Sequence, residues 1–192
     1  TPMHPKRTND ELIARATPML LTAANRIATS KLDDLTNESV DDLTRVMSSH
    51  LMPIVEAIRT GNVQIRNDLH EVVGPFLRRG RIQDRMVAQP QGYAGDYLTL
   101  DWIYQQPYDG SREDDVWNRF CYRQQASRAV RSRIDIVRDL MAGVIRRATG
   151  PTRFLDVASG PGRIERKVID LLGSPPHPVH VDLVDADADA VE

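Results

Sequence analysis

The sequence predicts an α/β protein in which a mainly α-helical N-terminal cap is followed by the first β-α-β part of a parallel sheet. Two observations carry this prediction. Apolar residues recur at helical spacing through much of the first 80 residues and again between positions 114 and 147. From Arg153 onwards the pattern changes to an apolar run, a turn of small residues, an amphipathic stretch and a second apolar run that ends in acids.

The first 80 residues are expected to form three or four helices, within a helical region that covers residues 1–88. Between Ser39 and Ile58 one apolar stripe runs at helical spacing. Ser39 suits the N-cap of this helix and Gly61 its stop, and Pro53 is expected to kink the helix or to end its first half. A second stripe follows at Ile65, Leu69, Val72 and Val73.

A middle region, residues 89–150, is expected to act as a cap or lid. Helical periodicity fails between Gln89 and Gly110, where glycines and prolines indicate a structured loop or short helices. Helical spacing returns from Asp114 to Arg147, as two helices or one long bent helix, and Gly150 and Pro151 end it.

Residues 151–192 are expected to begin a sheet. "FLDV", from Phe154, is a buried-strand type of run, the turn from Gly160 to Gly162 is tight, and "VHVDLVDAD" predicts a second strand. Two parallel strands leave edge groups exposed. We therefore expect either a missing C-terminal segment or a second chain to complete this sheet.

The glycine loop is the strongest sign of a ligand site. A loop that leaves a parallel strand and opens a helix must turn sharply and let a ligand touch its backbone, which favours small residues such as those of "ASGPG". Asp185 ends the second strand, where an acid can accept both hydroxyls of an adenosine ribose. We expect the bend around Gly160 and the carboxylate of Asp185 to lie side by side.

"FLDVASGPGR" followed by "VDLVDAD" resembles the first two motifs of class I S-adenosylmethionine-dependent methyltransferases. The resemblance implies a Rossmann-like sheet that binds S-adenosylmethionine, with Asp156 at the methionine end of the cofactor and Asp185 at its ribose. The residues it marks as cofactor-binding are Asp156, Ala158, Ser159, Gly160, Gly162, Asp185 and Ala186. Ala158 departs from the family pattern, which has glycine there. A dinucleotide loop fits less well, because Glu165 stands where its third glycine would be.

The segment "PQGYAGDYLTLDWIY" is similar to a region of bacterial methyltransferase-like proteins with a helical N-terminal cap. These include proteins of 3-hydroxy fatty acid methyl ester biosynthesis and enzymes that close azetidine or aziridine rings. This resemblance implies an enzyme of bacterial secondary metabolism, such as antibiotic biosynthesis, that methylates a small molecule. Two alternatives stay open: ring closure with the same cofactor, and a non-catalytic subunit that completes such an enzyme.

Most aromatic residues of the chain lie between Tyr93 and Tyr122. Rings around a sulfonium would attract it by about 0.5 to 2 kcal/mol. Packing is the favoured role of Trp102, Trp117 and Phe120. Polar groups of the glycine-broken loop can instead face a ligand, so the candidate catalytic residues are Tyr93, Asp96 and Tyr97, which would orient or deprotonate an acceptor.

Charge and composition exclude several other classes of function. The net charge of −2 and the lack of a basic, aromatic stripe argue against nucleic acid as a partner. Most arginines from Arg112 onwards are expected to form a solvated or ion-paired helix face, although Arg128 or Arg131 can reach a cofactor carboxylate, and Arg128 is assigned to the cofactor site. His177 and His180 lie in a proline-rich loop, so we expect no metal site.

The expected location of the protein is the cytoplasm. Cys121 is the single cysteine, so no intrachain disulfide can form, and we expect it to be a small buried residue. No apolar run approaches the roughly 18 to 20 residues that span a bilayer, so no membrane partner is expected. The partner that remains is a small-molecule substrate.

Overall fold

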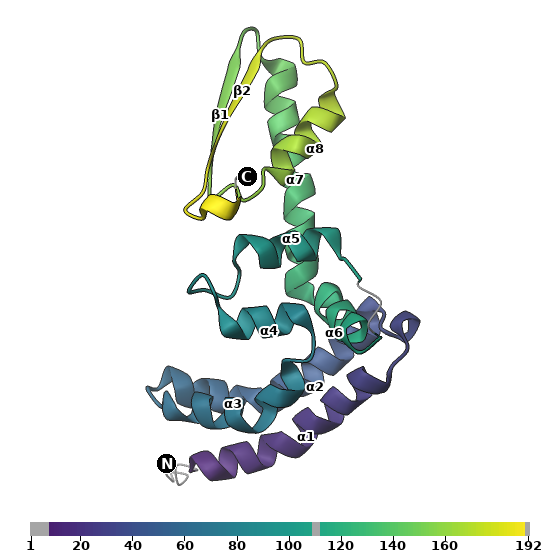
Figure 1. The fold of residues 1–192 in the computed structure, drawn as a ribbon, viewed down its shortest axis with the longest axis vertical. Helices are drawn as coiled ribbons and strands as arrows, with labels where there is room; N and C mark the ends of the chain where they lie inside the picture. The colour runs from purple at the N-terminus through teal and green to yellow at the C-terminus, as the bar shows by residue number, and fades with distance from the viewer. Residues whose placement is uncertain (1–7, 109–111, 191–192) are drawn as a thin grey trace, which may run out of the picture. The chain divides into compact units, whose positions relative to one another are not determined.

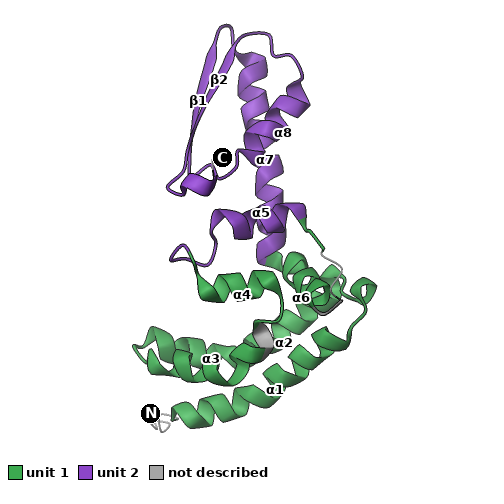
Figure 2. Ribbon diagram, viewed as in Figure 1, with its two compact units in different colours: residues 1–90, 106–125 green, residues 91–105, 126–192 purple. Residues whose placement is uncertain are grey.

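The computed structural model describes residues 8–108 and 112–190, in which a series of helices precedes two strands (Figure 1). The chain divides into two compact units (Figure 2). The helical unit comprises residues 1–90 and 106–125, and the strand unit comprises residues 91–105 and 126–192. The middle region defined from the sequence, 89–150, is therefore shared between the two units.

The helical unit confirms the helices expected over the first 80 residues. Its elements are α1 (Asn9–Thr29), η1 (Leu32–Asp34), α2 (Asn37–Arg59), α3 (Gln64–Leu77), α4 (Arg81–Ala88) and α6 (Arg112–Arg123). A capping box begins α1, because the Thr8 side chain accepts from the Glu11 backbone N–H while the Glu11 carboxylate accepts from that of Thr8. Helix α2 runs through the exposed Pro53, so of the two alternatives expected for Pro53, the one in which it ends the first half of the helix is wrong.

The N-cap of α2 is Thr36, and the choice of Ser39 was wrong. The Thr36 hydroxyl accepts from the Ser39 backbone N–H at 3.2 Å, and the Ser39 hydroxyl donates to the Asp34 carbonyl at 2.8 Å. "TNES" offers three residues of types that can cap a helix: Thr36, Asn37 and Ser39. The first one caps it, because Asn37 and Glu38 already have helical geometry.

The core of the helical unit contains two of the aromatic rings expected to pack. Trp117 and Phe120 on α6 meet edge to face with ring centroids 6.2 Å apart, and both are buried. They belong to a cluster with Ala23, Ile27 and Val40 of α1 and α2. The expected packing role of Trp117 and Phe120 is confirmed, and the core they build is that of the helical unit. Cys121, the next residue, is buried as expected.

The strand unit contains the predicted β-α-β arrangement. Its elements are α5 (Tyr97–Gln105), α7 (Gln125–Arg147), β1 (Thr152–Val157), α8 (Arg163–Leu172), β2 (Val179–Val184) and η2 (Ala188–Ala190). The strands are parallel, in a register that runs from Thr152 opposite Val179 to Val157 opposite Val184. The structure is mixed α/β and mostly helical. Its described residues contain these two strands alone, so a complete Rossmann-like sheet is not shown.

Both helices beside the sheet lie on the same side of it (Figure 1). The buried side chains Ile145 of α7 and Val168 of α8 face Val179 and Val181 across this interface. On β1, every second residue is exposed, and Leu155 and Val157 reach 66% and 69% exposure. Parallel sheets are normally covered on both faces, so the helices α7 and α8 complete only one of the two layers that this sheet needs.

Candidate functional site

A cavity of about 720 Å³ opens at the carboxyl ends of β1 and β2. All of its lining residues belong to the strand unit. The loop wall consists of Asp156, Val157, Ala158, Ser159, Gly160, Pro161, Arg163, Ile164, Val184, Asp185 and Ala186; the helical wall consists of Tyr93, Gly95, Tyr97, Leu100, Tyr104, Arg133 and Val137. Ligand pockets for small molecules have volumes of roughly 300 to 1,000 Å³, and the open ends of parallel strands are where ligands bind in such sheets.

The loop between β1 and α8 is bent by three residues with left-handed backbone. Ala158, Gly160 and Gly162 have φ values of 61°, 55° and 62°. The backbone N–H groups of Ala158 and Ser159 donate to the Val184 carbonyl at 2.7 and 3.2 Å, which fastens the loop to the end of β2. The bend therefore lies directly beside the residues that follow the second strand.

The Asp185 carboxylate lies inside this bend. Its Oδ2 accepts from the Gly160 backbone N–H at 2.8 Å and its Oδ1 from the Asp187 backbone N–H at 3.0 Å. These N–H groups, first that of Asp187 and then that of Gly160, lower the pKa of Asp185. The group is an anion near neutral pH. Because a carboxylate has about four acceptor positions, both of its oxygens can accept further hydrogen bonds.

A pair of neighbouring carboxyl groups, Asp156 and Glu165, lies near the loop. Asp156 at the end of β1 lines the cavity, and Glu165 in the first turn of α8 is buried, with 6% of its surface exposed. Burial raises the pKa of Glu165 to about 7, and a hydrogen bond to Asp156 adds to the shift. Two adjacent carboxyls cannot both be ionised cheaply, so Glu165 keeps its proton up to a pH of about 7.

The helical wall places aromatic rings opposite the loop. A Cβ added at Gly160 would lie 3.8 Å from Tyr97 Cβ, so Tyr97 lies against the bend. Tyr93 is 53% exposed at the rim. Arg133 Nη2 donates to the Tyr104 hydroxyl at 2.8 Å. Arg163, at the start of α8, donates from Nε to Asp101 of α5, which joins the two walls.

The structure brings most of the predicted site residues to this cavity. Those that line it are Tyr93, Tyr97, Asp156, Ala158, Ser159, Gly160, Asp185 and Ala186. Asp96 is not among the lining residues, since it is 1% exposed and its Oδ1 accepts from the Thr99 backbone N–H at 2.9 Å, as the N-cap of α5. Gly162 lies one step behind the lining, where an added Cβ would be 2.8 Å from Leu183 Cδ1.

Arg133 takes the place in the cavity wall that was assigned to Arg128 from the sequence. Five positions on an α-helix correspond to a rotation of about 140°, whereas four positions return to nearly the same face. Arg133 therefore shares its face with Val137, and Arg128 and Arg131 do not line the cavity. In the sequence, Arg133 stands four positions before Val137, which places both residues on one face of the helix. This spacing pointed to a site only once the position of the cavity was known.

Exchanging the residue types at positions 158 and 162 tests the conformation of the loop. A left-handed backbone costs a residue other than glycine about 1 to 2 kcal/mol. We expect Ala158→Gly to raise the free energy of unfolding by about 0.5 to 1 kcal/mol, and Gly162→Ala to lower it by about 2 kcal/mol because its Cβ also meets Leu183. Urea denaturation measures both. Equal changes of the same sign would show that the loop adopts another conformation.

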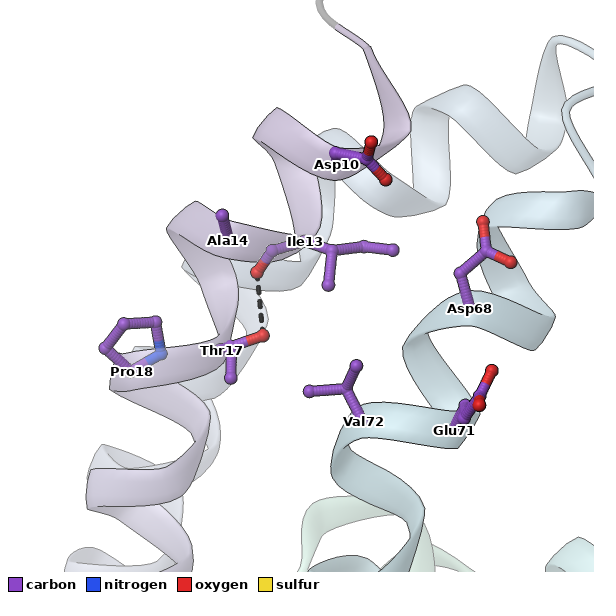
Figure 3. A pocket seen from close by; sticks show the side chains of 8 residues that line it. All are labelled: Asp10, Ile13, Ala14, Thr17, Pro18, Asp68, Glu71 and Val72. Carbon is purple, nitrogen blue, oxygen red and sulfur yellow. Dashed lines mark hydrogen bonds between the residues drawn. The ribbon is translucent and has the colours of Figure 1, made fainter.

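A shallower hollow of about 500 Å³ lies between α1 and α3 in the helical unit (Figure 3). Ile13 and Val72 form its apolar part, and Asp10, Asp68 and Glu71 carry the carboxylates around it. Asp68 accepts from Gln64 Nε2 at 2.7 Å and from Asn9 Nδ2 at 3.4 Å. Within the described residues, no group of His, Cys, Asp or Glu side chains is arranged to hold a metal ion.

Among the helices in the described ranges, none has the length and apolar character needed to cross a membrane. The functional interpretation depends on the geometry of the cavity at the carboxyl ends of β1 and β2, because the chain matches no family model, no curated protein and no solved structure.

Proposed function

We propose that the strand unit is the cofactor-binding part of a Rossmann-like, class I S-adenosylmethionine-dependent methyltransferase that acts on a small molecule. The observation that carries this proposal is the contact between the Gly160 backbone N–H and the Asp185 carboxylate, 2.8 Å apart at the mouth of a cavity of about 720 Å³. A bent loop after the first strand and an acid after the second are the two features that an adenosyl ligand requires at this end of a parallel sheet.

The residues present fit such a ligand. Asp185 keeps acceptor capacity for the ribose hydroxyls, and its lowered pKa keeps it ionised. The left-handed backbone at Gly160 leaves that side of the loop without a side chain, so a ligand can approach the main chain. When bound, S-adenosylmethionine supplies a methyl group on a sulfonium. The rings of Tyr93 and Tyr97 would face this cation and exclude water from it.

The acceptor is best placed against the helical wall. In the proposed reaction Tyr93 and Tyr97 position the acceptor or deprotonate it, since both line the cavity. Asp96, as the N-cap of α5, would act by fixing the start of the helix that carries Tyr97. Completion of the sheet by further elements belongs to the same proposal, and the exposed side chains of Leu155 and Val157 support a second layer over that face.

Calorimetric titration of the chain tests the adenosyl site directly. We expect S-adenosylhomocysteine and adenosine to bind, because the loop backbone at Gly160 and the Asp185 carboxylate can hold an adenosyl ligand at its ribose hydroxyls. A chain that is folded by circular dichroism and takes up neither adenosyl compound would contradict the proposal. Incubation with S-adenosylmethionine then separates the reactions by their products, since S-adenosylhomocysteine marks methyl transfer and methylthioadenosine marks ring closure of the cofactor.

A further inference from the structure

Arg133 is a positive charge in the cavity wall without a carboxylate partner. One of its N–H groups donates to the Tyr104 hydroxyl at 2.8 Å, and none of the carboxylates in the described part of the chain forms an ion pair with it. Arg163, the other arginine of the cavity, is paired with Asp101. Of the two arginines, Arg133 is therefore the one whose charge is available to a ligand.

The donor geometry of Arg133 favours a planar anion. A guanidinium carries five N–H donors in a rigid fork, which match the two oxygens of a carboxylate better than a single hydroxyl. Tyr104 occupies one of these donors and holds the side chain from the neighbouring helix α5. Asp156 and Asp185 line the same cavity without pairing to Arg133. The cavity thus presents separate acidic and basic positions to one ligand.

We propose that Arg133, held by Tyr104, binds a carboxylate of the molecule that occupies the loop cavity. The identity of that molecule rests on the proposed function. Two sources can bring the carboxylate: the amino-acid end of the adenosyl cofactor, or an acceptor that is itself a carboxylic acid. Both place a carboxylate against the same donors, and the experiment below separates them.

Chemical labelling of arginine can test whether a bound ligand covers Arg133, and it needs no substitution. The chain is treated with phenylglyoxal, and modification of Arg133 is followed by mass spectrometry in the presence of S-adenosylhomocysteine, methylthioadenosine or succinate. Arg146, exposed on the same helix and outside the cavity, is the internal control. Methylthioadenosine keeps the adenosine but lacks the amino-acid end, so it isolates the effect of the carboxylate.

We expect S-adenosylhomocysteine to slow the labelling of Arg133 severalfold and methylthioadenosine to leave it unchanged, which assigns the position to the cofactor. If succinate slows the labelling in a chain already saturated with S-adenosylhomocysteine, the position belongs to the acceptor. Equal protection by methylthioadenosine, or no protection by any of the three compounds, overturns the proposal. Arg146 should be labelled at one rate throughout.

Substitutions give a second readout. We expect Arg133→Gln to weaken the binding of S-adenosylhomocysteine by about 10- to 100-fold while changing that of methylthioadenosine less than about twofold, with Arg133→Lys in between. Arg146→Gln is the matched control, and thermal melts check folding. Equal losses for both ligands overturn the proposal. So does an unchanged affinity for S-adenosylhomocysteine, unless succinate has protected Arg133.

The two proposals fail in different ways. Suppose that S-adenosylhomocysteine and methylthioadenosine both bind in calorimetry, but no ligand changes the labelling of Arg133 and its substitution changes no affinity. Then only the carboxylate position is wrong. If neither adenosyl compound binds and succinate still protects Arg133, the adenosyl function is wrong and the carboxylate position stands.

Discussion

Replacing Asp185 with alanine should weaken the binding of S-adenosylhomocysteine and of adenosine by about 100-fold or more. Each hydrogen bond from a ribose hydroxyl to a carboxylate contributes about 1.5 to 3 kcal/mol, and two such bonds are lost together. The substitution also removes the acceptor for the Gly160 backbone N–H, which is part-buried beneath the loop. The bend then loses one of the contacts that join it to the end of β2, so the pocket is less well formed before the ligand arrives.

Asp189→Ala is the matched control for this experiment. Asp189 is exposed, lies four residues further along the chain and does not line the cavity. Both variants are checked for folding by circular dichroism, and their affinities for S-adenosylhomocysteine are measured by isothermal titration. We expect the affinity of Asp185→Ala to be about 100-fold lower than that of Asp189→Ala. Equal affinities for Asp185→Ala and Asp189→Ala would rule out Asp185 as the ribose acceptor, and with it the main support for an adenosyl site.

Raising the pH from 5 to 8 should destabilise the strand unit through Glu165. Burial first, and the hydrogen bond to Asp156 second, raise the pKa of this carboxyl from 4.5 in the unfolded chain to about 7 in the folded one. The folded state therefore binds the proton more tightly. The stability that Glu165 contributes is complete below pH 4.5 and is lost as the pH rises through 7. The loss amounts to about 2 to 3 kcal/mol.

Glu165→Gln isolates this contribution, because glutamine keeps the shape of the protonated acid and does not titrate. The free energy of unfolding, measured in urea between pH 5 and 8, should fall more steeply for the natural chain than for Glu165→Gln. The control is Asp170→Asn, at an exposed position of the same helix α8, which should follow the natural chain. Parallel profiles for the natural chain and Glu165→Gln would show that Glu165 is ionised in the folded protein.

Several corrections share one physical origin. The sequence predicted Ser39 as the N-cap of α2, yet Thr36 suits that position as well, and the structure shows that Thr36 caps the helix. Likewise, an arginine on α7 was expected at the ligand, and the rotation of that helix against the cavity brought Arg133 there in place of Arg128. Local patterns specify residue types and spacing, but the side of a helix that meets a cavity depends on packing.

The acidic residues show the same limit. Asp96 was assigned to chemistry because it lies between two tyrosines in a glycine-rich loop, and the structure makes it the N-cap of α5. In the sequence, Glu165 was informative only as the residue that stands in place of the third glycine of a dinucleotide-binding loop. Its raised pKa arises from burial beside Asp156, nine positions earlier in the chain. No local pattern contains that contact, because it forms when α8 folds back along β1.

The sequence by itself determined the helices of the N-terminal region, the strands that flank the glycine loop and the presence of an acid after the second strand, because these depend on periodicity and turn chemistry within a few residues. Tertiary structure alone decided which side chains share the cavity. Parallel pairing of β1 with β2 brings Asp185 to the Gly160 backbone, and helix rotation brings Arg133 to Tyr104. Those contacts join residues distant in the chain, and packing free energy selects them.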